Sequence, residues 1–125
     1  DAEVSSFFGD IARRLAAAHL LICRAGASTM AEIAAAGRPA VLVPYPHAMD
    51  DHQSANARAA ADTGAAWLLA EGPLTVDDFR ACLERALGDP AGLAAAAAAA
   101  RRLDPPGAAE ALADLLPITG EEARP

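Results

Sequence analysis

Residues 19–32 read HLLICRAGASTMAE, and this stretch decides the fold because its character changes in the middle. The apolar run at 19–23 is short and bounded by polar residues, as a buried parallel strand should be. Gly26 and the alanines beside it permit a tight turn. Helical periodicity then covers 29–36, so the stretch predicts a strand that passes through a tight turn into a helix.

The same change from strand to helix recurs along the chain. Two further apolar runs and two further helical patterns are present: strands at 40–43 and 65–69, and helices at 10–18 and 51–63. Gly37 and Gly64 stand where two of the helices should end. Alternating strands and helices indicate consecutive crossover units, so we expect an α/β fold with a parallel sheet flanked by helices.

Beyond residue 70 the sequence predicts helices and offers no clear candidate for a binding or catalytic site. A capped helix should begin at Thr75, and an alanine-rich helix should cover 91–103. A last helix is expected at 107–116, before a frayed end. A chain of 125 residues is large enough for one domain, which we place at 1–118, with a flexible tail at 119–125.

Composition argues against several classes of protein. The net charge of -7 and the scattered arginines argue against a nucleic-acid partner, because phosphate binding needs a clustered basic face. Cys23 and Cys82 lack the spacing of metal or redox sites, which favours buried free thiols in a reducing cytoplasm. No apolar run approaches the roughly 20 residues that span a bilayer. Because the chain starts at Asp1 without an initiator methionine, we expect a fragment of a longer protein.

Two loops carry most of the chemistry, and they follow Cys23 and Val43. Both lie at the carboxyl ends of predicted strands, where ligands collect in parallel sheets. The first loop leads into the helix that contains Glu32, and the free N–H groups of a helix start attract a phosphate. Glu32 completes a capping box with Thr29, or its carboxylate accepts hydrogen bonds from a sugar diol. Because capping boxes are common, the residues alone favour the first interpretation.

The second loop, 44–57, reads PYPHAMDDHQSANA. It contains four side chains of metal-ligand type: His47, Asp50, Asp51 and His52. These ligands suit zinc or manganese, but either aspartate also makes a good helix cap. Gln53 and Asn56 would then lie on neighbouring turns of the helix. We therefore expect this loop to offer amides and a glutamine to a sugar rather than to hold a metal.

Four further residues have open roles. His19 is expected to be a tolerated residue at a strand start, and Arg24 to pair with a carboxylate or an anion. Phe7 and Phe8 should begin the first helix, where their rings belong either to the core or to a face that contacts a base. None of these readings decides a function by itself.

The two loops together resemble a known family. The likeness is carried by CRAGASTMAEIAAAG at 23–37, RPAVLVPYPH at 38–47 and DHQSANA at 51–57. These segments are similar to the C-terminal domain of the MurG family, the bacterial UDP-N-acetylglucosamine transferases that complete the peptidoglycan precursor lipid II. The likeness runs from about Phe7 to the terminal helices. It implies the donor-binding domain of a GT-B glycosyltransferase, in which two Rossmann-like domains face a cleft.

The resemblance also implies roles for individual residues. Phe7 and the backbone of Phe8 would hold the uracil, and Glu32 would bind the ribose hydroxyls. Gln53, with His52, would contact the N-acetylglucosamine. The helix start would face the diphosphate, and this part of the donor site comprises Gly26, Ala27, Ser28, Thr29, Met30 and Ala31. The resemblance implies no catalytic residue in this chain, no metal and no tightly bound cofactor.

Partners and location follow from the same resemblance. The donor would be UDP-N-acetylglucosamine, and the acceptor lipid I would bind an N-terminal domain that this sequence lacks. The parent protein would associate peripherally with the cytoplasmic face of the bacterial inner membrane. The family's general-base histidine and Gly-rich loop are also missing, so we expect the chain to be inactive alone. Two alternatives stay open: another GT-B enzyme, such as a lipid glycosyltransferase or a UDP-N-acetylglucosamine epimerase, and a non-catalytic nucleotide-sugar-binding module.

Overall fold

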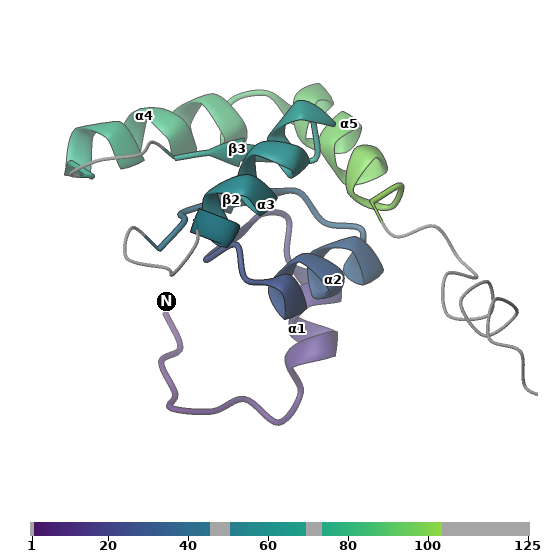
Figure 1. Ribbon diagram of the computed structural model, residues 1–125. Coiled ribbons are helices and arrows are strands. Elements are labelled where there is room, and N and C mark those ends of the chain that lie inside the picture. Colours follow the sequence, from purple (N-terminus) through teal and green to yellow (C-terminus); the bar gives the residue numbers. More distant parts are fainter. Residues whose placement is uncertain (1, 46–50, 70–73, 104–125) are drawn as a thin grey trace, which may run out of the picture.

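The computed structural model describes residues 2–45, 51–69 and 74–103, and at its centre lies a small parallel sheet (Figure 1). The strands are β1 (Leu21–Cys23), β2 (Ala40–Leu42) and β3 (Ala66–Leu68). They lie in the order β1-β2-β3, and the first residues of the three strands are in register. Each strand falls inside an apolar run of the sequence, so the predicted parallel sheet is confirmed.

Helices connect and follow the strands. Within the described residues they are α1 (Ile11–Ala17), α2 (Ala27–Ala36), α3 (His52–Asp62), α4 (Val76–Leu87) and α5 (Pro90–Ala100). All five overlap stretches that the sequence predicts to be helical, although α2 and α5 begin before the predicted ranges. The helix predicted at 107–116 and the tail predicted at 119–125 lie outside the described residues, so the domain boundary at 118 stays a prediction.

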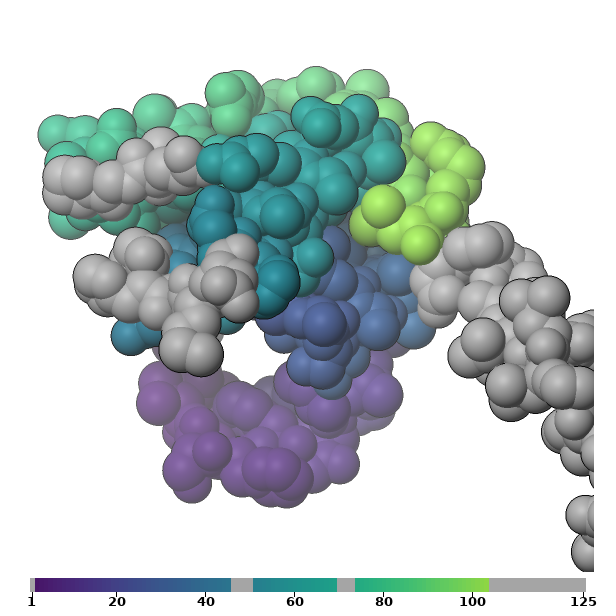
Figure 2. Space-filling model, viewed as in Figure 1, coloured from purple at the N-terminus to yellow at the C-terminus, as the bar shows by residue number. Residues whose placement is uncertain are grey.

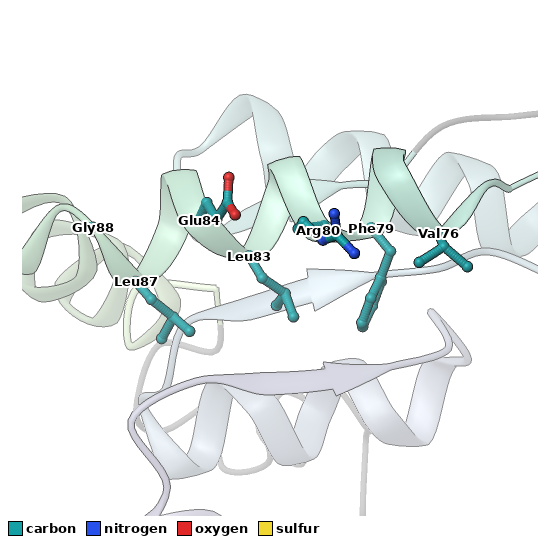
Figure 3. Close-up of a pocket in the computed structure, with 7 residues that line it drawn as sticks. All are labelled: Val76, Phe79, Arg80, Leu83, Glu84, Leu87 and Gly88. Carbon is teal, nitrogen blue, oxygen red and sulfur yellow. The ribbon is translucent and has the colours of Figure 1, made fainter.

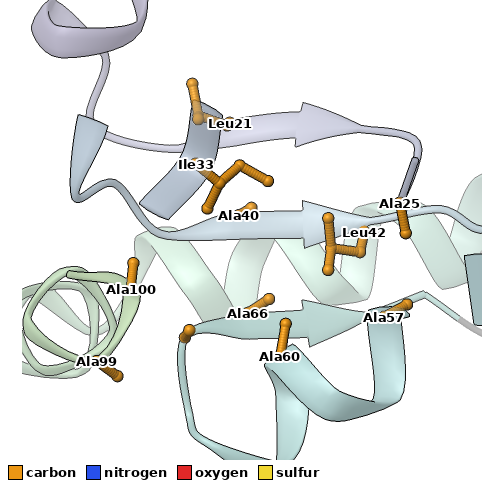
Figure 4. Close-up of a cluster of buried hydrophobic side chains, with 11 residues drawn as sticks. Leu21, Ala25, Ile33, Ala40, Leu42, Ala57, Ala60, Ala66, Ala99 and Ala100 are labelled. Carbon is orange, nitrogen blue, oxygen red and sulfur yellow. The ribbon is translucent and has the colours of Figure 1, made fainter. Parts of the chain in front are cut away.

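Each face of the sheet carries its own cluster of side chains. Ala40 and Leu42 point to one face and Val41 to the other, because successive residues of a strand alternate. The first face packs against residues of α2, α3 and α5, and Figure 4 shows the labelled ones: Ile33, Ala57, Ala60, Ala99 and Ala100. The second face packs against α4 through Phe79, Cys82 and Leu83. The chain is thus a sheet between two helical layers.

Helix ends follow their sequence signals closely. Gly37 ends α2 in a left-handed conformation with φ 59°, and Gly64 follows α3 with φ 78°. Thr75 and Asp78 form the capping box of α4, in which the Thr75 oxygen accepts the Asp78 N–H at 3.1 Å and the Asp78 carboxylate accepts the Thr75 N–H at 3.2 Å. Hydrogen bonds from the Thr75 hydroxyl and N–H lower the pKa of Asp78.

Two predicted boundaries near the N-terminus are wrong. α2 begins at Ala27, two residues before the predicted start, because alanine and serine continue a helix readily once Gly26 has made the turn. α1 begins only at Ile11, since a turn at Gly9 and Asp10 separates it from the two phenylalanines. Residues 2–18 lie against the α2 side of the molecule (Figure 2), and α1 packs on α2.

Candidate functional site

The start of α2 presents backbone N–H groups at the carboxyl end of β1. Gly26 is the N-cap residue, and no side chain in the described ranges caps the helix. The first helical hydrogen bond runs from the Met30 N–H to the Gly26 carbonyl at 2.9 Å. The N–H groups of Ala27, Ser28 and Thr29 therefore have no acceptor within the helix and carry the partial positive charge of its N-terminus. This arrangement suits an anion such as a phosphate.

Gly26 leaves space in front of this helix start. No described heavy atom beyond its neighbours lies within 4 Å of the position that a Cβ atom would occupy there. Its φ of -67° and ψ of 153° are open to most residues, so the glycine is not needed for backbone conformation. Its value at this position is the room that it leaves for a ligand to approach the backbone.

The capping box predicted for Thr29 and Glu32 is wrong. Because α2 begins at Ala27, Thr29 is already the third helical residue and Glu32 the sixth. A capping threonine has to precede the first helical residue, so Thr29 cannot fill that position here. Glu32 is instead an exposed carboxylate on the second turn of the helix.

The position of Glu32 is reported by a neighbouring cysteine. Cys23 ends β1 and is half-buried. Burial raises the pKa of the Cys23 thiol, and the negative charge of Glu32 raises this pKa further. The carboxylate therefore lies within electrostatic range of the residue that ends β1.

Arg24 links the two chemically loaded loops. Its Nη1 atom donates to the carbonyls of Val43 at 3.3 Å and of Pro44 at 3.1 Å. Its guanidinium also lies over the Tyr45 ring, 5.5 Å from the centroid. Within the described residues the structure thus pairs Arg24 with backbone carbonyls and an aromatic ring, while pairing with a bound anion stays a prediction.

Side chains of α3 reach both loops. The Gln53 Oε1 atom accepts the Tyr45 N–H at 3.0 Å, and the Asn56 Nδ2 atom donates to the Ala25 carbonyl at 3.0 Å. His52 is exposed at the first position of the helix. The structure therefore brings the first turns of α3 beside the turn that precedes α2.

The cap and metal interpretations of the second loop have different outcomes. Asp51 is the N-cap residue of α3, but its side chain makes no capping hydrogen bond and lies 3.8 Å from an Arg58 nitrogen. The left-handed φ of 53° at Asp51 differs from the extended backbone that a capping aspartate usually adopts. Among the described residues no group of three or more metal-ligand side chains is gathered, while His47 and Asp50 lie outside them.

Of the two phenylalanines, Phe8 is held in front of α1 by Arg14. This guanidinium lies 4.2 Å from the centroid of the Phe8 ring and binds the carboxylates of Glu3 and Asp10, each at 2.7 Å. Hydrogen bonds from Arg14 lower the pKa of both carboxyls. The Phe7 ring is 81% exposed, so the core interpretation of this residue is wrong and its ring is free to contact a ligand.

A cavity of about 540 Å³ lies elsewhere, on α4 (Figure 3). Its lining comes from one helix and its cap: Val76, Phe79, Arg80, Leu83, Glu84, Leu87 and Gly88. The apolar members point toward the sheet side of the helix in Figure 3. A groove that is mostly apolar, with Arg80 and Glu84 as its charged members, does not suit a nucleotide sugar. The loops at the sheet edge are the better candidate site.

Comparison with known proteins decides the family. The model of the glycosyltransferase family 28 C-terminal domain matches residues 1–113. The chain belongs to this family. A family 28 protein from Paramagnetospirillum magneticum, named UDP-N-acetylglucosamine–N-acetylmuramyl-(pentapeptide) pyrophosphoryl-undecaprenol N-acetylglucosamine transferase, is 54% identical over 93% of the chain. A protein of the same name from Rhodospirillum centenum is 55% identical over 90% of it.

A solved structure agrees with this family assignment. The crystal structure of Acinetobacter baumannii MurG matches with a TM-score of 0.80 and 41% identity, covering 90% of this chain and 32% of that one. The likeness supports the Rossmann-like arrangement of a GT-B C-terminal domain. The chain spans about a third of the length of the curated relatives that it matches: 31% of the Paramagnetospirillum protein and 30% of the Rhodospirillum centenum protein.

The structure leaves the donor-binding roles of the predicted residues as predictions while it fixes their places. The α2 start, Glu32 and Gln53 all lie around the carboxyl ends of β1 and β2, as predicted. Sequence reasoning missed the links that Arg24 and Asn56 make between the loops. Both are polar residues in or beside the two loops, which was the only hint in the sequence. Periodicity carries no information about hydrogen bonds between distant segments.

Proposed function

We propose that the chain is the donor-binding part of an inverting glycosyltransferase. The complete enzyme moves N-acetylglucosamine from UDP-N-acetylglucosamine to undecaprenyl-pyrophosphoryl-muramyl-pentapeptide, converting lipid I to lipid II in peptidoglycan synthesis. The observation that carries this proposal is the 54% identity to a relative of that name across 93% of the chain. The uncapped start of α2, beside an exposed carboxylate, gives the identity a physical counterpart.

Each part of the donor has a residue suited to it. The N–H groups of Ala27, Ser28 and Thr29 bind the diphosphate, while Gly26 lets it approach. Met30 and Ala31 continue this helix turn. Glu32 accepts hydrogen bonds from the ribose diol, whose hydroxyls are donors for a carboxylate.

The two ends of the donor are bound by residues outside α2. The Phe7 ring, which is 81% exposed, and the backbone of Phe8 hold the uracil. Gln53 and His52, at the first positions of α3, contact the hydroxyls of N-acetylglucosamine. Together these residues place the sugar near the first turn of α3.

The chemistry that this chain supplies is stabilisation of the leaving group. In a direct displacement the acceptor hydroxyl attacks the anomeric carbon and UDP departs, so negative charge grows on the diphosphate. N–H groups fixed at the start of α2 stabilise that charge without a tightly bound metal or cofactor. The acceptor lipid, the catalytic base and the contact with the cytoplasmic face of the inner membrane belong to the N-terminal part of a peripheral membrane protein.

The test is the substitution Glu32→Ala in the complete protein that the gene encodes. Loss of a charged hydrogen-bond acceptor should weaken UDP-N-acetylglucosamine binding roughly 10- to 100-fold. The preference for UDP over 2′-deoxy-UDP should fall with it, because the ribose diol loses its partner. Isothermal titration calorimetry measures both affinities, and Glu84→Ala, which removes an exposed carboxylate on α4, is the matched control.

Two results contradict this proposal. Unchanged donor affinity in Glu32→Ala, with a lowered melting temperature, would leave Glu32 a purely structural residue. A complete protein that binds the donor but transfers no sugar to lipid I would be a nucleotide-sugar-binding module instead of this enzyme.

A further inference from the structure

Asn56 reaches from α3 to the turn that precedes α2. Its Nδ2 atom donates to the Ala25 carbonyl at 3.0 Å, and the two residues are 31 positions apart in the sequence. Ala25 is fully buried, whereas Asn56 is half-buried. The hydrogen bond therefore joins the second turn of α3 to the backbone immediately before the N-cap Gly26.

This carbonyl belongs to the peptide unit that also contains the Gly26 N–H. The peptide is trans, so its N–H points opposite to its carbonyl. Fixing the Ala25 oxygen against Asn56 therefore fixes the direction of the Gly26 N–H on the other side of the chain. The Gly26 N–H precedes the N–H groups of Ala27 and Ser28 in the chain, and we assign those two groups to the diphosphate.

The hydrogen bond from Asn56 supplements the packing of Ala25, which is buried in the hydrophobic core. A cavity of about 320 Å³ lies between α2 and α3, and Asn56 is part of its wall. The other lining residues are mostly small: Met30, Ala31, Ala34, Ala59, Ala60 and Leu103. Gly26 has no side chain with which to hold the turn. Alanine side chains and a glycine constrain a turn weakly, since they offer little surface for contact.

We propose that Asn56 is a positioning residue for diphosphate binding, acting through the orientation of the Ala25–Gly26 peptide. The proposal rests on the proposed function, because it takes the α2 start as the diphosphate site. Asn56 makes no contact with the ligand itself. Through Asn56 the turn is also held at a fixed position relative to Gln53, which lies three residues earlier on α3.

The experiment compares ligands with and without phosphates in the complete protein. Asn56→Asp keeps the shape of the side chain but, when ionised, has no donor for the Ala25 carbonyl, and Asn56→Ala removes the side chain. Both variants should bind UDP about 10-fold more weakly while uridine affinity changes less than about 2-fold, because uridine does not use the turn. Calorimetry measures UDP binding, and ligand-observed NMR measures the weaker binding of uridine.

Thr63→Ala is the matched control. The Thr63 Oγ1 atom donates to the Ala60 carbonyl at 2.8 Å, so this variant also removes a side-chain hydrogen bond from the α3 region, at its far end. Thr63→Ala should lower the melting temperature about as much as the Asn56 variants do, but it should leave the ratio of UDP affinity to uridine affinity unchanged. If one Asn56 variant fails to fold, the other carries the test.

The outcomes separate this role from the proposed function. A UDP-to-uridine affinity ratio that stays at the wild-type value in the Asn56 variants would overturn the positioning role and leave the proposed function standing. Wild-type protein that binds neither UDP nor UDP-N-acetylglucosamine would overturn the proposed function, and the positioning role with it.

Discussion

The charge of Glu32 affects the pKa of one neighbouring thiol, that of Cys23. Cys23 is half-buried at the end of β1, and its pKa is raised first by burial and second by the carboxylate of Glu32. The second of these causes comes from a charged side chain of α2. The pKa of Cys23 therefore responds to the charge of Glu32, the residue that we assign to the ribose, even when no ligand is bound.

We predict that Glu32→Gln lowers the pKa of Cys23. The amide removes one of the two causes that raise this pKa, so the thiolate forms at lower pH, although burial keeps the pKa above its usual value. The rate of alkylation, measured against pH in a Cys82→Ala background, should therefore rise at a lower pH than in the parent. Glu84→Gln is the control, and a profile identical to the parent's in Glu32→Gln would show that the two groups do not interact.

The same thiol affects stability in a defined direction. A group whose pKa is raised on folding stabilises the protein fully below its unfolded pKa. That stability is lost as the pH rises through the folded value. For Cys23 this loss of stability occurs at alkaline pH and is complete above the pKa of the folded protein. Because Glu32→Gln lowers that pKa, the loss should be complete at a lower pH.

Residue-level prediction succeeded where the cause is local. Gly37 could be identified as a helix end because only glycine adopts its left-handed backbone easily. It failed for Thr29 and Glu32, whose spacing fits a capping box equally well inside a helix. The link between Asn56 and Ala25 could not be predicted, since 31 residues of chain separate the partners and only the fold brings them together.

At the scale of an element, two glycines end helices in similar conformations but different surroundings. A Cβ atom added at Gly37 would lie 2.5 Å from Cγ and 2.6 Å from Nε of Arg101, whereas a Cβ at Gly64 meets no described atom within 4 Å. Both positions carry the backbone strain of a left-handed residue. Only Gly37 adds a collision with the residue that follows α5.

Gly37→Ala should therefore destabilise the protein more than Gly64→Ala. Left-handed strain costs each variant about 1–2 kcal/mol, and the displaced Arg101 side chain adds to the loss at Gly37. Urea unfolding gives both free energies of unfolding. The extra loss should disappear when Gly37→Ala is combined with Arg101→Ala. Equal losses in the two single variants would mean that Arg101 moves aside without cost.

Element types and order could be predicted from the sequence, while element boundaries were less certain. Short continuous apolar runs located β1, β2 and β3, although only β2 is buried along its whole length. The start of α2 was misplaced, since alanine and serine at 27 and 28 are compatible with either a turn or a helix. At the site this difference matters, because it decides which N–H groups remain unpaired.

For the whole molecule, the sequence predicts a layered sheet but does not say which helix covers which face. Periodicity marks the apolar side of a helix, yet it carries no information about which side of the sheet that helix joins. Among the described helices, α4 packs on the face of Val41, and α2, α3 and α5 pack on the face of Leu42. The proposed donor site therefore depends on one layer more than on the other.

Val41 and Leu42 are adjacent, and both side chains are fully buried, but they should affect different layers. Leu42→Ala should cost about 2–5 kcal/mol and Val41→Ala about 2 kcal/mol, since each leaves a cavity in a packed cluster. Hydrogen exchange through local openings should speed up in α4 for Val41→Ala and in α2 and α3 for Leu42→Ala. UDP affinity should fall further in the second variant, because the α2 start belongs to that layer. The same exchange pattern in both variants would show that the two clusters act as one core.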